Sequence, residues 1–98
     1  MKKEIIAIIG LGYWGTIVTN TLVQLKIFKR IYIYDNDFEK VKILKKKFKT
    51  KVYIISFDEI VKKKDIKNIF LATPPKNNFN ILKMLIKAKK ISLLKNQD

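Results

Sequence analysis

The chain has 98 residues, a formal net charge of +14, and neither cysteine nor histidine. Its length fits one small domain, and the missing residue types exclude disulfides, thiolate metal sites and a histidine general base. Glu4 interrupts the apolar start that would otherwise imitate a signal peptide, and no apolar stretch approaches the ~20 residues of a membrane span. We therefore expect a soluble, cytoplasmic domain that makes no membrane contact.

The positive charge comes almost entirely from lysine, since Arg30 is the only arginine. The lysines are scattered over expected helix faces, with the densest group at 45–49, and the abundance of Ile and Asn is typical of an AT-rich gene. We interpret the lysines as a solvated surface, which makes a nucleic-acid partner the less favoured alternative. A nucleic-acid-binding protein would bind DNA or RNA with an affinity that falls steeply as the salt concentration rises.

Apolar runs and helical stripes alternate along the chain. Strands are expected at 3–9, 30–35, 51–55 and 68–72, and helices at 14–26, 38–48, 58–63 and 77–88. Asp37 and Asp58 are expected to cap the second and third helices. The first helix is expected to bury one apolar side, formed by Ile17, Val18, Thr21, Leu22 and Leu25.

This alternation predicts an α/β fold of Rossmann type, which is a doubly wound parallel sheet with helices on both faces. We expect residues 1–98 to form its amino-terminal portion as one dinucleotide-binding domain, with strand order 3-2-1-4. In such a sheet, ligands bind at the carboxyl ends of the strands, where the order reverses.

A glycine-rich turn, Gly10-Leu11-Gly12-Tyr13-Trp14-Gly15, joins the first strand to the first helix. Gly10 permits the tight turn, Gly12 leaves room for a pyrophosphate, and Gly15 lets the helix pack closely on the sheet. The unpaired amides from about Tyr13 to Thr16 are expected to point at the phosphates.

Asp35 ends the next apolar run, at the ~20-residue spacing typical of dinucleotide-binding domains. Its carboxylate is expected to accept hydrogen bonds from the adenosine ribose and to repel a 2′-phosphate, which favours NAD over NADP. The alternative is that the glycines only form a tight turn and that Asp35 caps the following helix.

Thr73-Pro74-Pro75 follows the fourth strand and is expected at the same sheet edge. There the Thr73 hydroxyl or the backbone is expected to contact the nicotinamide half of the cofactor. The alternative is that the two prolines only end the strand.

Three features together resemble one family: Gly-Leu-Gly-Tyr-Trp-Gly at 10–15, Asp35, and Leu-Ala-Thr-Pro-Pro at 71–75. The chain is similar to the amino-terminal domain of the glucose–fructose oxidoreductase and inositol dehydrogenase (Gfo/Idh/MocA) family. The resemblance implies an NAD(P)-dependent oxidoreductase that acts on sugars, polyols or their derivatives by hydride transfer. The expected cofactor-binding residues are Gly10, Gly12, Tyr13, Trp14, Gly15, Asp35, Thr73, Pro74 and Pro75.

The chain also departs from the family pattern. Asn78 stands where the family usually has histidine, and Lys95-Asn96-Gln97 stand where it has Glu-Lys-Pro, so no catalytic residue is matched. The family's substrate-binding domain is absent from the sequence. We therefore expect a truncated fragment that is inactive alone, with a sugar or polyol substrate bound only by the full-length protein.

We hypothesise that a one-base frameshift near Lys89-Lys90 produced the unmatched tail at 91–98. With permitted AT-rich codons, one added C before Ile91 makes the shifted frame read His-Ile-Phe-Ile-Glu-Lys-Pro. Sequencing the gene tests this hypothesis, since an open reading frame for the second domain should follow directly. The remaining alternatives are a stand-alone module that senses NAD for a partner protein and a basic nucleic-acid-binding protein.

Overall fold

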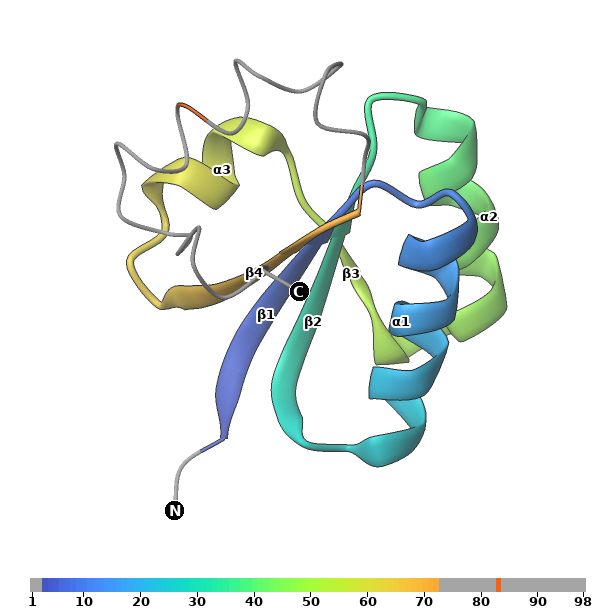
Figure 1. Ribbon diagram of the computed structural model, residues 1–98, viewed down its shortest axis with the longest axis horizontal. Helices are drawn as coiled ribbons and strands as arrows, with labels where there is room; N and C mark the ends of the chain where they lie inside the picture. The colour runs from blue at the N-terminus through green and yellow to red at the C-terminus, as the bar shows by residue number, and fades with distance from the viewer. Residues whose placement is uncertain (1–2, 73–82, 84–98) are drawn as a thin grey trace, which may run out of the picture.

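The computed structural model describes residues 3–72 and Lys83, and it contains the expected alternation of strands and helices (Figure 1). In chain order the elements are β1 (Glu4–Ile9), α1 (Tyr13–Leu25), β2 (Phe28–Tyr34), α2 (Phe38–Phe48), the 3-10 helix η1 (Lys49–Lys51), β3 (Tyr53–Ile54), α3 (Phe57–Lys62) and β4 (Ile66–Leu71). The helix expected at 77–88 lies outside these residues except for Lys83. Within the described ranges, no helix is both long and apolar enough to cross a membrane.

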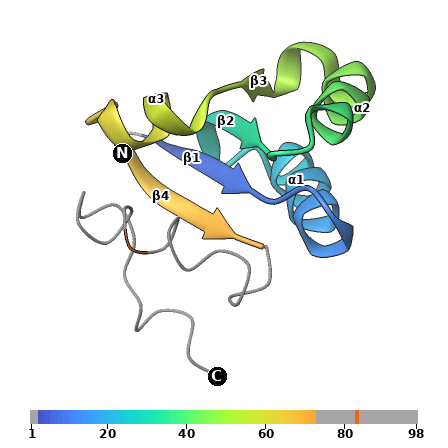
Figure 2. The same ribbon diagram turned by 90° about the horizontal axis from the view of Figure 1, so that it is seen from above.

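The four strands form one parallel sheet with the order β3-β2-β1-β4. This order confirms the prediction of a Rossmann-type fold. Helices α1 and α2 lie on one face of the sheet and α3 lies on the other, as Figure 2 shows. Since all strands run in the same direction, their carboxyl ends share one edge, beside the start of α1.

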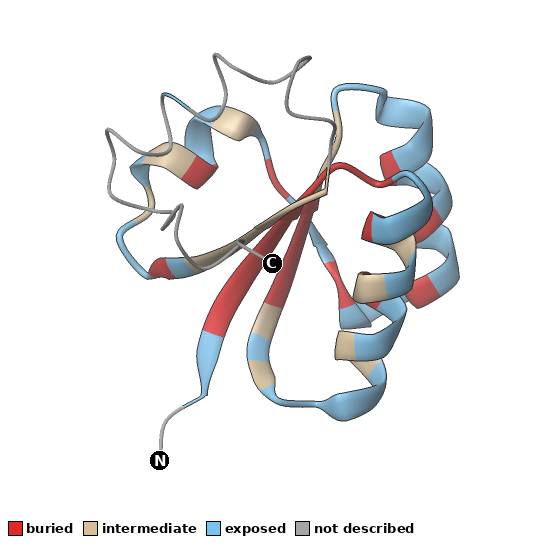
Figure 3. Ribbon diagram, viewed as in Figure 1, coloured by how far each residue is buried: buried red, intermediate tan, exposed pale blue. Residues whose placement is uncertain are grey.

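A hydrophobic core lies on each face of the sheet. Alternate residues of β1 supply both cores: Ile6 and Ile8 face α1 and α2, while Ile5, Ala7 and Ile9 face α3. Because β1 is buried on both faces, its sequence is a continuous apolar run rather than an alternating one. Figure 3 shows the burial concentrated in β1 and β2. The central strand is thus fixed from both sides, and it holds the glycine turn at its carboxyl end.

The buried side of α1 differs from the predicted one. Gly15 and Thr19 are buried, whereas Ile17 is 38% exposed and Leu25 is 56% exposed. Thr21 is exposed as well, and of the predicted set only Val18 and Leu22 pack against the core. The close approach of Gly15 to the sheet sets the rotation of the helix, and this rotation turns the bulkier side chains outward. Thr19 fits the interior because its hydroxyl donates to the Gly15 carbonyl at 2.7 Å.

The strand boundaries also shift from the predicted ones. Lys26 ends α1 in a left-handed conformation. One residue, Ile27, separates it from Phe28, where β2 begins. Strand β3 is reduced to two residues, because η1 occupies Lys49–Lys51 and β3 pairs only with β2, at the sheet edge. Strand β4 begins at Ile66, two residues before the predicted start.

The predicted cap of α2 is confirmed, whereas the predicted cap of α3 is not. Asp37 caps α2 as predicted, with its carboxylate accepting a hydrogen bond from the Glu39 amide at 3.1 Å. The prediction that Asp58 caps α3 is wrong, because Ser56 and Glu59 form a capping box that starts the helix at Phe57. Asp58 instead lies in the first turn and pairs with Lys62 at 3.1 Å.

We expect Ser56→Ala to lower the free energy of unfolding by about 1 kcal/mol, since it removes the cap of α3. Asp58→Ala is the matched control, and its exposed ion pair should contribute less than about 0.5 kcal/mol. Urea denaturation followed by circular dichroism measures both values. A larger effect at Asp58 than at Ser56 would show that the capping assignment is wrong.

Candidate functional site

The glycine turn lies at the carboxyl edge of the sheet, where three strand ends are joined by backbone hydrogen bonds. The Gly10 amide donates to the Tyr34 carbonyl of β2 at 2.9 Å. The Ala72 amide, just after β4, donates to the Ile9 carbonyl of β1 at 2.8 Å. The turn is therefore held in a fixed position between the ends of β2 and β4, which is the place where the strand order reverses.

The three glycines of the turn meet three different requirements. Gly10 has φ of 99°, a conformation that side chains disfavour. A β-carbon at Gly15 would overlap the Gly10 carbonyl oxygen and lie 2.8 Å from its carbon, so only glycine permits this close approach. A β-carbon at Gly12 would meet nothing within 4 Å. The space above Gly12 is thus open.

The first turn of α1 has no side-chain cap and no acidic residue. By contrast, α2 and α3 both begin with a side-chain cap and carry acidic residues in the first turn. The Thr16 amide bonds back to the Gly12 carbonyl at 3.0 Å, and the amides that precede it have no partner inside the helix. Together with the helix dipole, these amides make the start of α1 suitable for an anion.

Asp35 lies at the end of β2, half-buried beside the glycine turn. Its Oδ2 accepts a hydrogen bond from the Leu11 amide at 2.7 Å, and its Oδ1 accepts one from the Asp37 amide at 2.8 Å. The carboxylate therefore connects the end of β2 to the turn between β1 and α1. Each carboxylate oxygen can accept a further hydrogen bond, so a ligand hydroxyl remains within its capacity.

The alternative role for Asp35, as the cap of the next helix, belongs to Asp37. The contact between Asp35 and the Leu11 amide was not predicted from the sequence. A partner 24 residues away gives no local signal, although the expected meeting of the two strand ends at one edge could have suggested it.

Tyr13 and Trp14 lie in the first turn of α1 and are largely exposed, at 75% and 62%. Their rings meet edge to face, with centroids 5.3 Å apart. Trp14 therefore packs against Tyr13 within the first helical turn and does not contribute to the hydrophobic core. Both aromatic residues directly follow Gly12 in the chain.

The remaining predicted site residues, Thr73, Pro74 and Pro75, lie outside the described residues. Ala72 precedes them, and its side chain lies 3.5 Å from the position that a Gly15 β-carbon would occupy. The chain therefore passes the glycine turn just before it reaches these three residues. Among residues 3–72 and Lys83, no cluster of three acidic, histidine or cysteine side chains could hold a metal ion.

A parallel sheet in this order, with a glycine turn at β1 and an acidic residue after β2, defines a dinucleotide-binding Rossmann domain. Residues 5–95 match the oxidoreductase family with an NAD-binding Rossmann fold, Gfo/Idh/MocA. The chain belongs to this family. The resemblance seen in the sequence is therefore confirmed.

Solved structures of larger proteins contain the same fold. GenD2 from gentamicin A biosynthesis, in complex with NAD, is 19% identical with a TM-score of 0.74; the match covers 90% of this chain and 25% of that one. The scyllo-inositol dehydrogenase from Lactobacillus casei, solved with NAD(H) and scyllo-inositol, is 22% identical with a TM-score of 0.71; the match covers 91% of this chain and 26% of that one. The chain thus spans about a quarter of these relatives. No curated protein sequence matches it significantly.

Proposed function

We propose that the glycine turn and the first turn of α1 bind the pyrophosphate of NAD, and that residues 1–98 are the nucleotide-binding domain of an oxidoreductase. The observation that carries this proposal is the uncapped start of α1 beside the open space at Gly12. A phosphate placed there receives hydrogen bonds from the amides of Tyr13 and Trp14. It also lies at the positive end of the helix dipole, equivalent to roughly half an elementary charge.

The residues present fit the cofactor at the adenosine end as well. Asp35 lies at the same edge, where the ribose would follow the pyrophosphate, and its carboxylate can accept from the ribose hydroxyls. A 2′-phosphate would be repelled by the carboxylate, so we propose NAD rather than NADP as the cofactor. For Thr73, Pro74 and Pro75 we propose contact with the nicotinamide half, because the chain reaches them directly after passing Gly15.

The bound cofactor would supply hydride transfer, and the protein must supply an oriented substrate and a proton acceptor. Family membership supports a sugar, a polyol or a derivative as the substrate of the whole protein. The chain itself contains no histidine, and Asn78 stands where the family usually places one. We therefore propose that these 98 residues bind the cofactor but do not turn over a sugar by themselves. A cytoplasmic location stays a prediction.

Calorimetric titration with NAD tests the binding proposal. Gly12→Val should weaken NAD binding at least about tenfold, or about 1.4 kcal/mol, because the added side chain fills the space above the turn. The fold should be retained, since a β-carbon at Gly12 meets no neighbour.

The matched control is Thr21→Val, an isosteric change on an exposed part of the same helix. It should leave the dissociation constant for NAD within about twofold of wild type. Equal NAD affinity in wild type and in folded Gly12→Val would show that the pyrophosphate does not bind at the glycine turn.

A further inference from the structure

A cavity lies at the edge of the sheet opposite to the glycine turn, near the amino ends of the strands. It is a cavity of about 330 Å³ between the end of α1, the start of β2 and the segment around η1. Five cations and no acidic residue line it, and Tyr53 forms part of its wall. The cations are Lys3, Lys26, Lys29, Arg30 and Lys51. A volume of this size fits a small molecule rather than a single ion.

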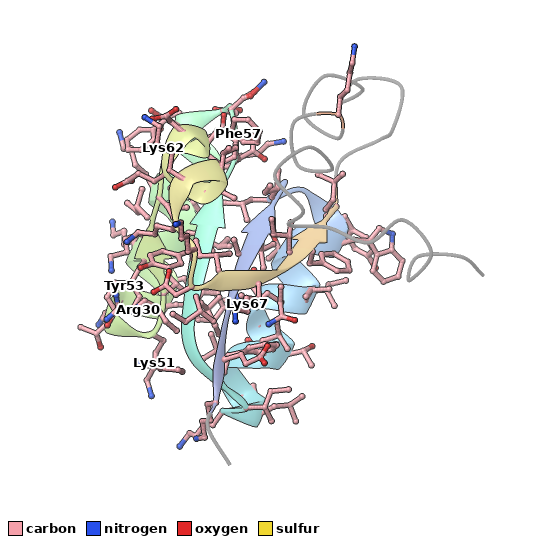
Figure 4. The ribbon with its side chains drawn as sticks, turned by 90° about the vertical axis from the view of Figure 1, so that its left-hand side faces the viewer. Arg30, Lys51, Tyr53, Phe57, Lys62 and Lys67 are labelled. Atoms are coloured by element: carbon pink, nitrogen blue, oxygen red, sulfur yellow. The ribbon has the colours of Figure 1, made fainter. Side chains whose placement is uncertain are left out.

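Arg30 is held in this cavity by contacts with two tyrosines. Its guanidinium lies 4.4 Å from the centre of the Tyr53 ring, and it donates a hydrogen bond to the Tyr32 hydroxyl at 3.1 Å. Within the described part of the chain, that is the one hydrogen bond of the Arg30 side chain, so four of the five guanidinium donors remain for a ligand. Figure 4 shows Arg30, Tyr53 and Lys51 grouped on one side of the sheet.

The charge at this edge stays positive after the opposing contributions are included. The carboxyl ends of α1 and α2 point this way, and together their dipoles amount to roughly one negative charge. A neighbouring cavity, which shares Lys3 and Lys29, adds Glu4 and Asp65 but also two more lysines. Seven cations therefore face two carboxylates and the two helix ends.

We propose that the cavity lined by Arg30, Lys29 and Lys51 binds a chain of phosphates, either a free polyphosphate or the phosphate chain of a small phosphorylated molecule. Guanidinium donors recognise phosphate oxygens directly, and the lysines add point charges around them. The site is separate from the glycine turn, since Arg30 lies on β2 and Asp35, which follows the strand, is five residues further on, about 16 Å for an extended chain.

Nuclear magnetic resonance titration of the ¹⁵N-labelled chain with sodium tripolyphosphate tests the proposal. Saturable amide shifts are expected at Lys29, Arg30 and Lys51, and shifts confined to the turn at Gly12 would contradict it. The amide signals of the cavity residues and of the glycine turn are observed separately. The result at the cavity therefore does not depend on whether NAD binds at the glycine turn. A parallel titration with ATP distinguishes the sources: equal affinity identifies the phosphate chain alone, and tighter binding at the same amides identifies a nucleotide.

The double variant Lys29→Gln/Lys51→Gln should weaken tripolyphosphate binding about tenfold, because it removes two exposed charged contacts. The matched control, Lys42→Gln/Lys46→Gln, removes the same charge from α2 outside the cavity and should change the affinity less than about twofold. Equal losses in both variants would show general attraction to a basic surface and would overturn the proposal. Tighter binding of duplex DNA, lost equally in both variants, would overturn it in favour of a nucleic-acid surface.

Discussion

Gly15→Ala is expected to lower the free energy of unfolding by about 3 kcal/mol, the upper end of the usual cost of overpacking. The added methyl group would overlap the carbonyl oxygen of Gly10, which is backbone and cannot rotate away as a side chain would. Relief requires α1 to move away from the sheet, and the turn that precedes it must move as well. NAD binding should then be lost together with stability.

Gly12→Ala is the matched control, since it adds the same atom to the same turn where nothing lies within 4 Å. We expect its free energy of unfolding to stay within about 0.5 kcal/mol of wild type. Urea unfolding curves compare the two variants. Similar losses at both glycines would contradict the close contact between the start of α1 and the end of β1.

Asp35→Ala should have two separable effects. It leaves the Leu11 amide without its acceptor, and an unpaired buried amide costs about 2 kcal/mol, which should appear in the free energy of unfolding. It also removes the carboxylate that would repel a 2′-phosphate. We therefore expect the dissociation constants for NAD and NADP, measured by calorimetry, to come within about threefold of each other, whereas wild type should prefer NAD at least about tenfold.

Asp37→Ala tests whether the loss of any nearby negative charge removes the preference for NAD over NADP, or only the loss of Asp35. It removes a neighbouring carboxylate and the cap of α2, at a cost of about 1 kcal/mol. The preference for NAD should nevertheless remain, since the Asp37 side chain forms no hydrogen bond to the glycine turn. It accepts one from the Glu39 amide of α2 instead. Loss of the preference in Asp37→Ala would mean that general charge, and not Asp35, selects the cofactor.

The fold could be predicted because its signals are local and repeated. The apolar run predicts β1, the apolar stripe predicts α2, and the alternation of strands and helices predicts a parallel sheet. The order of its strands is the one typical of dinucleotide-binding domains. The glycine turn was predictable for the same reason, because Gly10 and Gly15 are required by the backbone of the turn itself.

The details that could not be predicted depend on contacts between distant parts of the chain. The rotation of α1 follows from the meeting of Gly15 with Gly10, and an apolar pattern favours Ile17 and Leu25 for the interior instead. The bond from the Leu11 amide to Asp35 joins two turns that only the completed sheet brings together. The basic cavity likewise gathers Lys3, Arg30 and Lys51 from three separate segments.

The fluorescence of Trp14 gives the most direct measurement of the central claim. It is the only tryptophan of the chain, and it lies exposed in the first turn of α1, where the coenzyme would bind. NADH should quench this emission saturably by energy transfer, and NADPH should need at least about tenfold higher concentration for the same effect. Quenching by NADH that does not saturate, or that NADPH matches at equal concentration, would contradict binding at the start of α1 beside Asp35.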